Sequence, residues 1–114
     1  MISVNGNNIR ISRGNTAYIE ISVKINGEDY ELQPGDKVIF TVKKTPSKSA
    51  DILFQKVLEG RLEIKILPSD TADLLPAKYY YDAALQTSGG DFYTFIEPSG
   101  FTVCATNSEV ISDG

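Results

Sequence analysis

The chain has 114 residues, with 11 lysines and arginines against 15 aspartates and glutamates, one cysteine and no histidine. This length corresponds to one ordinary domain, whose folding buries roughly two-thirds of the surface that the unfolded chain exposes. The formal net charge of −4 excludes binding to nucleic-acid phosphates as a main role, because such binding needs clustered basic side chains. The short basic stretch VKKTPSK is interpreted as a solvated strand end and loop.

The first half of the chain alternates apolar and polar residues, which is the period of a strand with one buried face. Residues 16–25 predict one strand, and the Asn-Gly pair at 26–27 predicts a tight hairpin turn after it. A Pro-Gly pair at 34–35 predicts a further turn, and residues 37–44 predict a second strand. The expected inward side chains are Ile19, Ile21, Val23, Ile25, Val38, Phe40 and Val42.

The middle of the chain is less regular. Residues 52–57 and 61–66 are interpreted as the two strands of a hairpin, with the Glu-Gly pair at 59–60 in the turn. Residues 69–75 predict one short helical turn, which Ser69 or Asp70 would cap and Pro76 would end. This turn is expected to carry Leu74 and Leu75 inward.

The three consecutive tyrosines in KYYYDAALQ divide between the two faces of a predicted strand. Tyr79, Tyr81, Ala83 and Leu85 share one face, and Tyr80, Asp82, Ala84 and Gln86 share the other. The glycine-containing segment TSGGD predicts a hairpin loop and FYTFI the returning strand. A turn at EPSG and a last strand GFTVCA follow, and the polar tail, residues 107–114, is expected to fray.

Seven or eight short strands with turn signals between them, and no long amphipathic helix, favour an all-β protein. A sandwich is favoured over a small barrel. We therefore expect a single β-sandwich domain over residues 1–106. Residues 1–10 lack the features of a secretory signal, and no stretch reaches the roughly 20 apolar residues of a membrane span. The chain is expected to be made in the cytoplasm, without membrane insertion.

Catalysis is not expected. Without histidine, no Ser-His-Asp or Cys-His arrangement forms within the chain. Cys104 cannot make an intrachain disulfide, and it is interpreted as a small buried apolar residue. No phosphate-binding loop or calcium loop is present, so no catalytic, cofactor-binding or metal-binding residue is assigned. A pair of carboxylates from distant strands stays open for glycoside chemistry.

Exposed aromatic residues leave a binding role open. Tyr18, Tyr30, Tyr80 and Tyr93 are candidates for a carbohydrate-binding strip, although tryptophan is absent. Asp82 is the carboxylate of interest, because it follows three tyrosines in an otherwise apolar strand. The simpler interpretation of Asp82 is an outward charge that discourages pairing at a sheet edge.

The segment SDTAD followed by YYY is similar to the tyrosine corner of immunoglobulin variable domains. The spacing from Asp70 to Tyr79 is longer than in those domains, and their cysteine is missing. The resemblance implies that the hydroxyl of Tyr79 or Tyr81 bonds to backbone near Leu74–Pro76. The alternative is that both tyrosines are simply half-buried strand residues.

The order of motifs over residues 9–106 resembles the immunoglobulin-like N-terminal domain of phage baseplate upper proteins and related small tail proteins. The motifs are ISRGNTAYIEISVKINGEDYEL, GDKVIFTVKK, ILFQKV, LEIKILPSDTADLLPAKYYYDAAL and GGDFYTFIEPSGFTV. The family often has a glycine just before its Tyr-x-Tyr-Asp strand, where this chain has Ala77 and Lys78. Its domain usually heads a longer protein, so the chain is expected to be either a free-standing module or a fragment.

The resemblance implies an immunoglobulin-like sandwich and a non-enzymatic adaptor in a phage or prophage tail or baseplate. Its partners would be other tail or baseplate subunits, or further copies of itself in a homo-oligomer. Its location would be the virion tail. The alternative function is a carbohydrate- or protein-binding β-sandwich module that acts at a cell surface.

Overall fold

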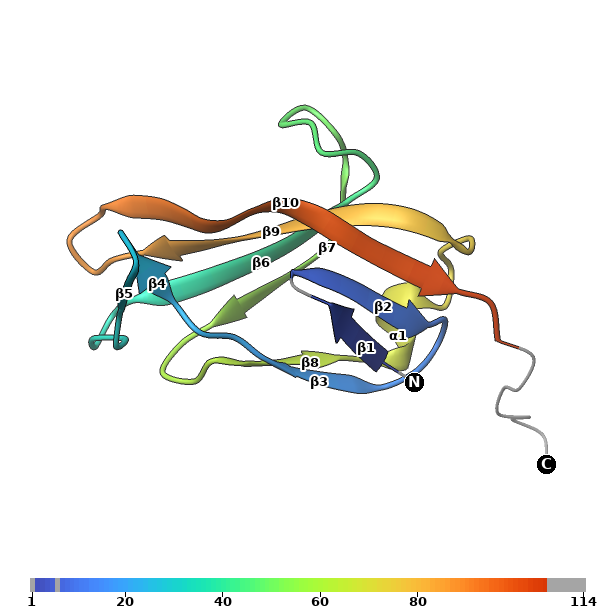
Figure 1. Cartoon of the computed structure of the whole chain (residues 1–114), viewed down its shortest axis with the longest axis horizontal. Helices are drawn as coiled ribbons and strands as arrows, with labels where there is room; N and C mark the ends of the chain where they lie inside the picture. The colour runs from blue at the N-terminus through green and yellow to red at the C-terminus, as the bar shows by residue number, and fades with distance from the viewer. Residues whose placement is uncertain (1, 6, 107–114) are drawn as a thin grey trace.

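The structure is a computed structural model that describes residues 2–5 and 7–106 (Figure 1). The described part contains ten strands and one short helix: β1 (Ile2–Asn5), β2 (Asn8–Ser12), β3 (Ala17–Glu20), β4 (Lys24–Ile25), β5 (Glu28–Asp29), β6 (Lys37–Lys43), β7 (Ile52–Leu58), β8 (Glu63–Ile66), α1 (Pro68–Thr71), β9 (Ala77–Gln86) and β10 (Phe92–Cys104). The prediction of an all-β protein is confirmed. The expected tail, residues 107–114, lies outside the described residues.

Six strands form one mixed sheet in the order β1-β2-β10-β9-β6-β7, in which only β2 and β10 run parallel. The other strands make two antiparallel pairs, β3 with β8 and β4 with β5. Figure 1 shows β3 and β8 running together along one side of the curled large sheet. The main core cluster draws its residues from both parts, namely Ile9, Ile11, Ala17, Ile19, Phe40, Val42, Ile64, Ile66, Tyr79, Tyr81, Phe101 and Val103.

Burial alternates along β6 and β9, so their side chains divide between the two faces of the large sheet as predicted. In β6, Val38, Phe40 and Val42 are fully buried. In β9, Tyr79 and Tyr81 are buried in the core, whereas Tyr80 between them is only half-buried on the other face. Tyr79 and Tyr81 therefore contribute to the core, and of the three tyrosines Tyr80 alone places its ring on the outer face.

The hydrogen bond expected for a tyrosine corner is present. The hydroxyl of Tyr79 donates to the carbonyl oxygen of Leu75 at 2.6 Å, across the turn that precedes β9. The hydroxyl of Tyr81 donates instead to the carbonyl oxygen of Asn7, which joins β9 to the start of β2. Each buried hydroxyl thus finds a backbone acceptor, as buried polar groups require.

Replacing Tyr79 by phenylalanine is expected to lower the free energy of unfolding by about 1 kcal/mol, because the bond to Leu75 is lost. Tyr81→Phe is expected to have a similar effect through Asn7. Urea denaturation measures both changes. Tyr80→Phe, on the outer face of the same strand, is the control, and equal stability of all three variants would contradict this role for the hydroxyls.

Helix α1 is shorter than the predicted turn at residues 69–75. It begins after Leu67, whose backbone N–H donates to the carboxylate of Asp70 at 2.7 Å. Leu74 packs against the core as expected. The expectation for Leu75 is wrong, because its side chain is 74% exposed. Leu75 contributes its backbone carbonyl oxygen, which accepts the hydrogen bond from the hydroxyl of Tyr79.

The predicted hairpin of residues 52–57 and 61–66 is wrong. Strand β7 pairs with β6 at the edge of the large sheet, while β8 leaves this sheet and pairs with β3. The Glu-Gly turn therefore joins two different sheets. Both strands have an apolar face, and that pattern does not distinguish a neighbour in the same sheet from one across the core.

The predicted turn at EPSG is also wrong. Strand β10 continues through this segment beside β9, with register shifts between Thr94 and Ile96 and between Ile96 and Ser99. These β-bulges absorb the proline within the strand. A Cβ atom at Gly100 would lie 3.0 Å from the Lys78 side chain and 3.1 Å from the Asn8 side chain, so a larger residue there would require these side chains to shift.

The predicted strand at residues 16–25 is divided into β3 and β4, but its facing is correct. Ile19 and Val23 are buried and Ile21 and Ile25 are half-buried, while the residues between them are exposed. The hairpin turn after β4 has Asn26 and Gly27 at φ 53° and 80°. These positive angles are those of the predicted tight turn.

Candidate functional site

The four candidate tyrosines do not form one strip. Tyr18 lies on β3 and is 57% exposed. Tyr93 lies opposite the buried Leu85, near the β9–β10 hairpin. Tyr30 is half-buried and donates a hydrogen bond to Asp36. Tyr80 and Asp82 are the two predicted candidates that share a surface, on the outer face of the large sheet.

This surface is a groove of about 650 Å³, which we call the outer groove. Its floor is made by side chains of β6, β9 and β10 that face away from the core. One row across the sheet is set by direct strand pairing, in which Ile39 lies between Val57 and Ala84, and Ala84 lies opposite Thr94. Because cross-strand pairing places these positions side by side, Ile39 and Ala84, which both line the groove, give its floor an apolar stripe.

A second row beside the stripe is polar. Thr41 lies between Gln55 and Asp82, and the amide of Gln55 donates to its hydroxyl at 3.0 Å. In the next row, Lys43 lies opposite Tyr80. The outer groove therefore places an apolar stripe, a carboxylate and an aromatic ring next to one another on a rigid sheet.

One wall of the outer groove is the loop of residues 44–51 between β6 and β7. Figure 1 shows this loop projecting from the sheet at the top of the molecule. The ammonium group of Lys43 lies 3.1 Å from the carbonyl oxygen of Lys48, which ties the loop back to β6. The opposite wall carries Phe92, whose side chain is 59% exposed.

The interpretation of Asp82 as a charge that protects a sheet edge is wrong. Strand β9 lies between β6 and β10 in the interior of the sheet, where no edge is available. The half-buried position raises the pKa of the Asp82 carboxyl by desolvation, and the positive charge of Lys43 partly opposes the change. A carboxylate kept partly from water at this place costs stability, because desolvation disfavours its charged form.

Replacing Asp82 by asparagine is expected to stabilise the protein at pH 7 by up to about 0.5 kcal/mol, a small effect because the group keeps contact with water. A raised pKa means that the native state favours the protonated carboxyl, so the wild type loses stability as the pH rises through that pKa. Urea denaturation at pH 7 and pH 3 should show a higher free energy of unfolding for Asp82→Asn than for the wild type only at pH 7. Asp91→Asn is the control, and an unchanged difference at both values would contradict the prediction.

A pair of carboxylates, as glycoside chemistry needs, does not line the outer groove. Among the residues that line it, Asp82 is the one carboxylate, whereas glycoside hydrolysis uses a pair. No group of three or more metal-binding side chains occurs within residues 2–5 and 7–106. The groove can offer shape, an apolar stripe and a few polar contacts, which are the elements of a binding surface.

One organising residue was not predicted from the sequence. Asp36 is buried and accepts three hydrogen bonds: from the hydroxyl of Tyr30 at 2.5 Å and from the backbone N–H groups of Gln33 and Ser88 at 2.9 Å each. It thus ties the loop before β6 to the β9–β10 hairpin. The aspartate of the Pro-Gly-Asp turn was the available signal, because aspartate accepts local backbone bonds in turns.

No helix of the described residues is long and apolar enough to cross a membrane. The chain matches no protein-family model, and searches of curated proteins and of solved structures also find no match.

Proposed function

We propose that this chain is a non-enzymatic adaptor domain of immunoglobulin-like type, which docks other protein subunits in a phage or prophage tail or baseplate. The outer groove is the proposed docking surface. The observation that carries the docking role is the apolar stripe through Ile39 and Ala84 on the outer face of a rigid sheet, next to the exposed ring of Phe92. Aromatic and apolar groups at the centre of a patch are typical of protein interfaces.

The strand order supports the immunoglobulin-like assignment. In such domains, strands G, F, C and C′ form one sheet, and strands B and E lie in the facing sheet. Here β10, β9, β6 and β7 are neighbours in that order, and β3 pairs with β8. The bond from Tyr79 to Leu75 occupies the place of a tyrosine corner at the start of strand F.

The phage assignment rests on the order of sequence motifs, and particle composition tests it. After prophage induction in the source bacterium, mass spectrometry of gradient-purified particles should detect peptides such as ISVKINGEDYELQPGDK. A few to a few dozen copies per particle are expected for a tail or baseplate component. Abundant protein in the cytosol but not in particles would overturn the assignment.

The docking surface is tested by a matched pair of substitutions. Thr94→Arg places a long cation beside Ala84 in the outer groove, whereas Thr16→Arg places the same group on an exposed loop before β3. Co-purification of tail subunits with the tagged chain should be lost for Thr94→Arg and kept for Thr16→Arg. Equal capture by both variants would exclude the outer groove as the docking surface.

Carbohydrate binding is the second candidate, favoured by the ring of Tyr80 beside Asp82 in the same groove. Stacking of a sugar on this ring predicts that Tyr80→Ala abolishes retention on a column of host glycans. Tyr93→Ala should keep retention, because Tyr93 is not among the residues that line the groove. Absence of retention for the wild type would exclude this candidate.

A further inference from the structure

Strand β3 has an open edge. The backbone N–H of Ile21 donates to the carbonyl oxygen of Leu62, directly across from it, at 2.9 Å. In antiparallel pairs, the residues that exchange such bonds alternate along the strand. Ile19 and Ile21 therefore direct their backbone groups toward β8, and Tyr18, Glu20 and Ser22 direct theirs to the opposite side.

No strand covers that opposite side within the described residues, because β3 pairs with β8 alone. The same alternation continues up to β4. Val23, just before β4, accepts a hydrogen bond from the N–H of Tyr30, so the backbone groups of Lys24 face away from that contact. A row of unpaired donors and acceptors thus follows Tyr18, Glu20, Ser22 and Lys24. At about 3.3 Å per residue, the row spans roughly 20 Å.

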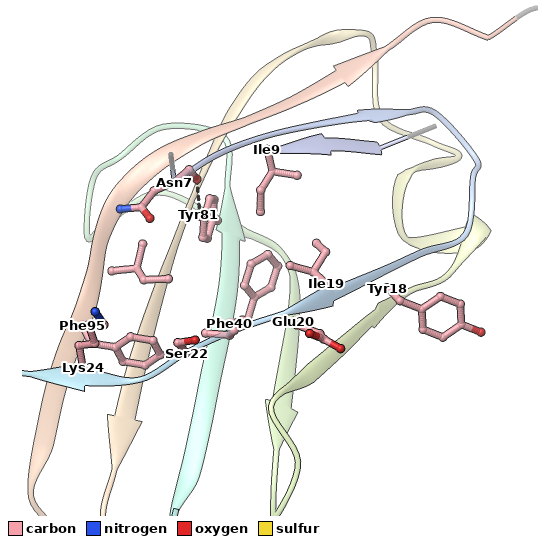
Figure 2. Close-up of a pocket in the computed structure, with 12 residues that line it drawn as sticks. Asn7, Ile9, Tyr18, Ile19, Glu20, Ser22, Lys24, Phe40, Tyr81 and Phe95 are labelled. Carbon is pink, nitrogen blue, oxygen red and sulfur yellow. Dashed lines mark hydrogen bonds between the residues drawn. The ribbon is translucent and has the colours of Figure 1, made fainter. Parts of the chain in front are cut away.

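An apolar slot lies beside this open edge, as Figure 2 shows. The slot has a volume of about 500 Å³, within the range of ligand pockets. Its floor reaches the rings of Phe40 and Tyr81, and its far wall is formed by Phe95 and Ile96 of β10. Asn7, which precedes β2, lies at its upper rim. The four residues of the open edge all line the slot.

We propose that the β3 edge and this slot bind an extended segment of a partner protein, which adds to β3 as a further strand. The row of backbone donors and acceptors is complementary to another extended backbone. The slot takes the alternate side chains that point inward, and its lining by Ile9, Ile19, Ile21 and Ile96 favours apolar ones. In strand addition, main-chain hydrogen bonds supply the affinity, and pockets for alternate side chains supply the specificity.

The occupant is a segment of about seven residues with apolar side chains at alternate positions. A second copy of the chain fits less well. If two β3 strands paired around a twofold axis, the isoleucines of each copy would still point into their own core, so the slot would stay unfilled. This inference extends the proposed docking role to a second surface, and it does not depend on the outer groove.

The test uses the full chain and a capped synthetic peptide, KTITVTITK, with amide hydrogen exchange followed by NMR. At saturating peptide, exchange of the Glu20 and Ser22 amides is expected to slow at least tenfold, while the Ile21 amide, already bonded to Leu62, changes little. A scrambled peptide of the same composition is the control. Unchanged exchange at the solubility limit of the peptide would overturn the proposal, as would equal protection by the scrambled peptide.

Two modifications test the backbone row. Glu20→Pro removes a donor from the open edge, and proline is tolerated at such an edge. The variant should fold and bind the peptide at least tenfold more weakly. Ile21→Pro is the matched control, expected to unfold more easily because it removes the bond to Leu62.

The second modification leaves the protein unchanged. A peptide N-methylated at alternate residues keeps its side chains and loses its donors along one edge. Of the two N-methylated registers, one should bind at least tenfold more weakly than the parent peptide. Parent-like affinity of both registers would overturn strand addition even if Glu20→Pro fails to fold. Because no tail subunit is used, failure here is distinct from failure of docking at the outer groove. Dimers that form without peptide, and that the peptide dissociates, would overturn the proposal and indicate a second copy as the occupant.

Discussion

Truncation of Phe101 to alanine is expected to lower the free energy of unfolding by about 3–5 kcal/mol, close to the entire stability of a marginal domain. The side chain is fully buried at the centre of an aromatic cluster. Its ring centroid lies 5.8 Å from that of Phe54, 6.3 Å from that of Phe40 and 6.4 Å from that of Tyr81. These contacts join β10 to β6, β7 and β9 on the core side of the sheet.

The matched control is Phe92→Ala on the same strand, since the ring of Phe92 is 59% exposed. That variant should stay within about 0.5 kcal/mol of the wild type. Urea denaturation measures both changes. Similar losses for the two variants would mean that the aromatic cluster does not hold the sheet together as the structure indicates.

The consequence of Phe101→Ala should extend to the slot beside β3. Phe40 and Tyr81 form both the floor of the slot and the immediate neighbours of Phe101. A cavity behind them would let these rings relax inward, because cores respond to lost volume by partial collapse. Strand addition is therefore expected to weaken in Phe101→Ala before the fold is lost.

The facing of individual residues could be predicted from the sequence because burial alternates locally. In β9, the buried Tyr79 and Tyr81 and the outward Tyr80 follow directly from a period of two. The pairing of strands could not be predicted in the same way. The apolar face of β8 fits β7 or β3 equally well in sequence, and only the fold shows that β8 pairs with β3, in one core cluster with Phe40.

The same distinction applies to the candidate site. Tyr80 and Asp82 could be found because an aromatic ring and a charge on an outward face are visible in one short segment. The outer groove itself was not predictable, since Ile39, Thr94 and the loop of residues 44–51 are far apart in sequence. Pro98 and Gly100 predict a turn, whereas in the structure this segment lies within β10, where β-bulges interrupt the pairing with β9.

Asp36→Asn is expected to lower Tm by roughly 10 °C at pH 7, because three hydrogen bonds to a buried carboxylate are weakened together. The bonds join two segments at the hairpin end of the large sheet, namely the loop before β6, with Tyr30 and Gln33, and the β9–β10 hairpin, with Ser88. Asparagine keeps the shape of the side chain but removes its charge and replaces one acceptor oxygen by a donor. Thermal denaturation followed by circular dichroism measures the change.

The pH dependence of this effect separates the charge of Asp36 from its shape. The hydroxyl of Tyr30, followed by the N–H groups of Gln33 and Ser88, lowers the pKa of the Asp36 carboxyl. A lowered pKa means that the native state favours the charged form, so its stabilisation is present above the unfolded-state pKa of about 3.9 and is lost as the pH falls through the native value. The Tm difference between Asp36→Asn and the wild type should therefore shrink below about pH 4. Asp91→Asn, at an exposed position in the hairpin loop that contains Ser88, should show no such Tm difference at either pH. A Tm difference for Asp36→Asn that stays constant from pH 7 to pH 2.5 would assign the loss to shape alone.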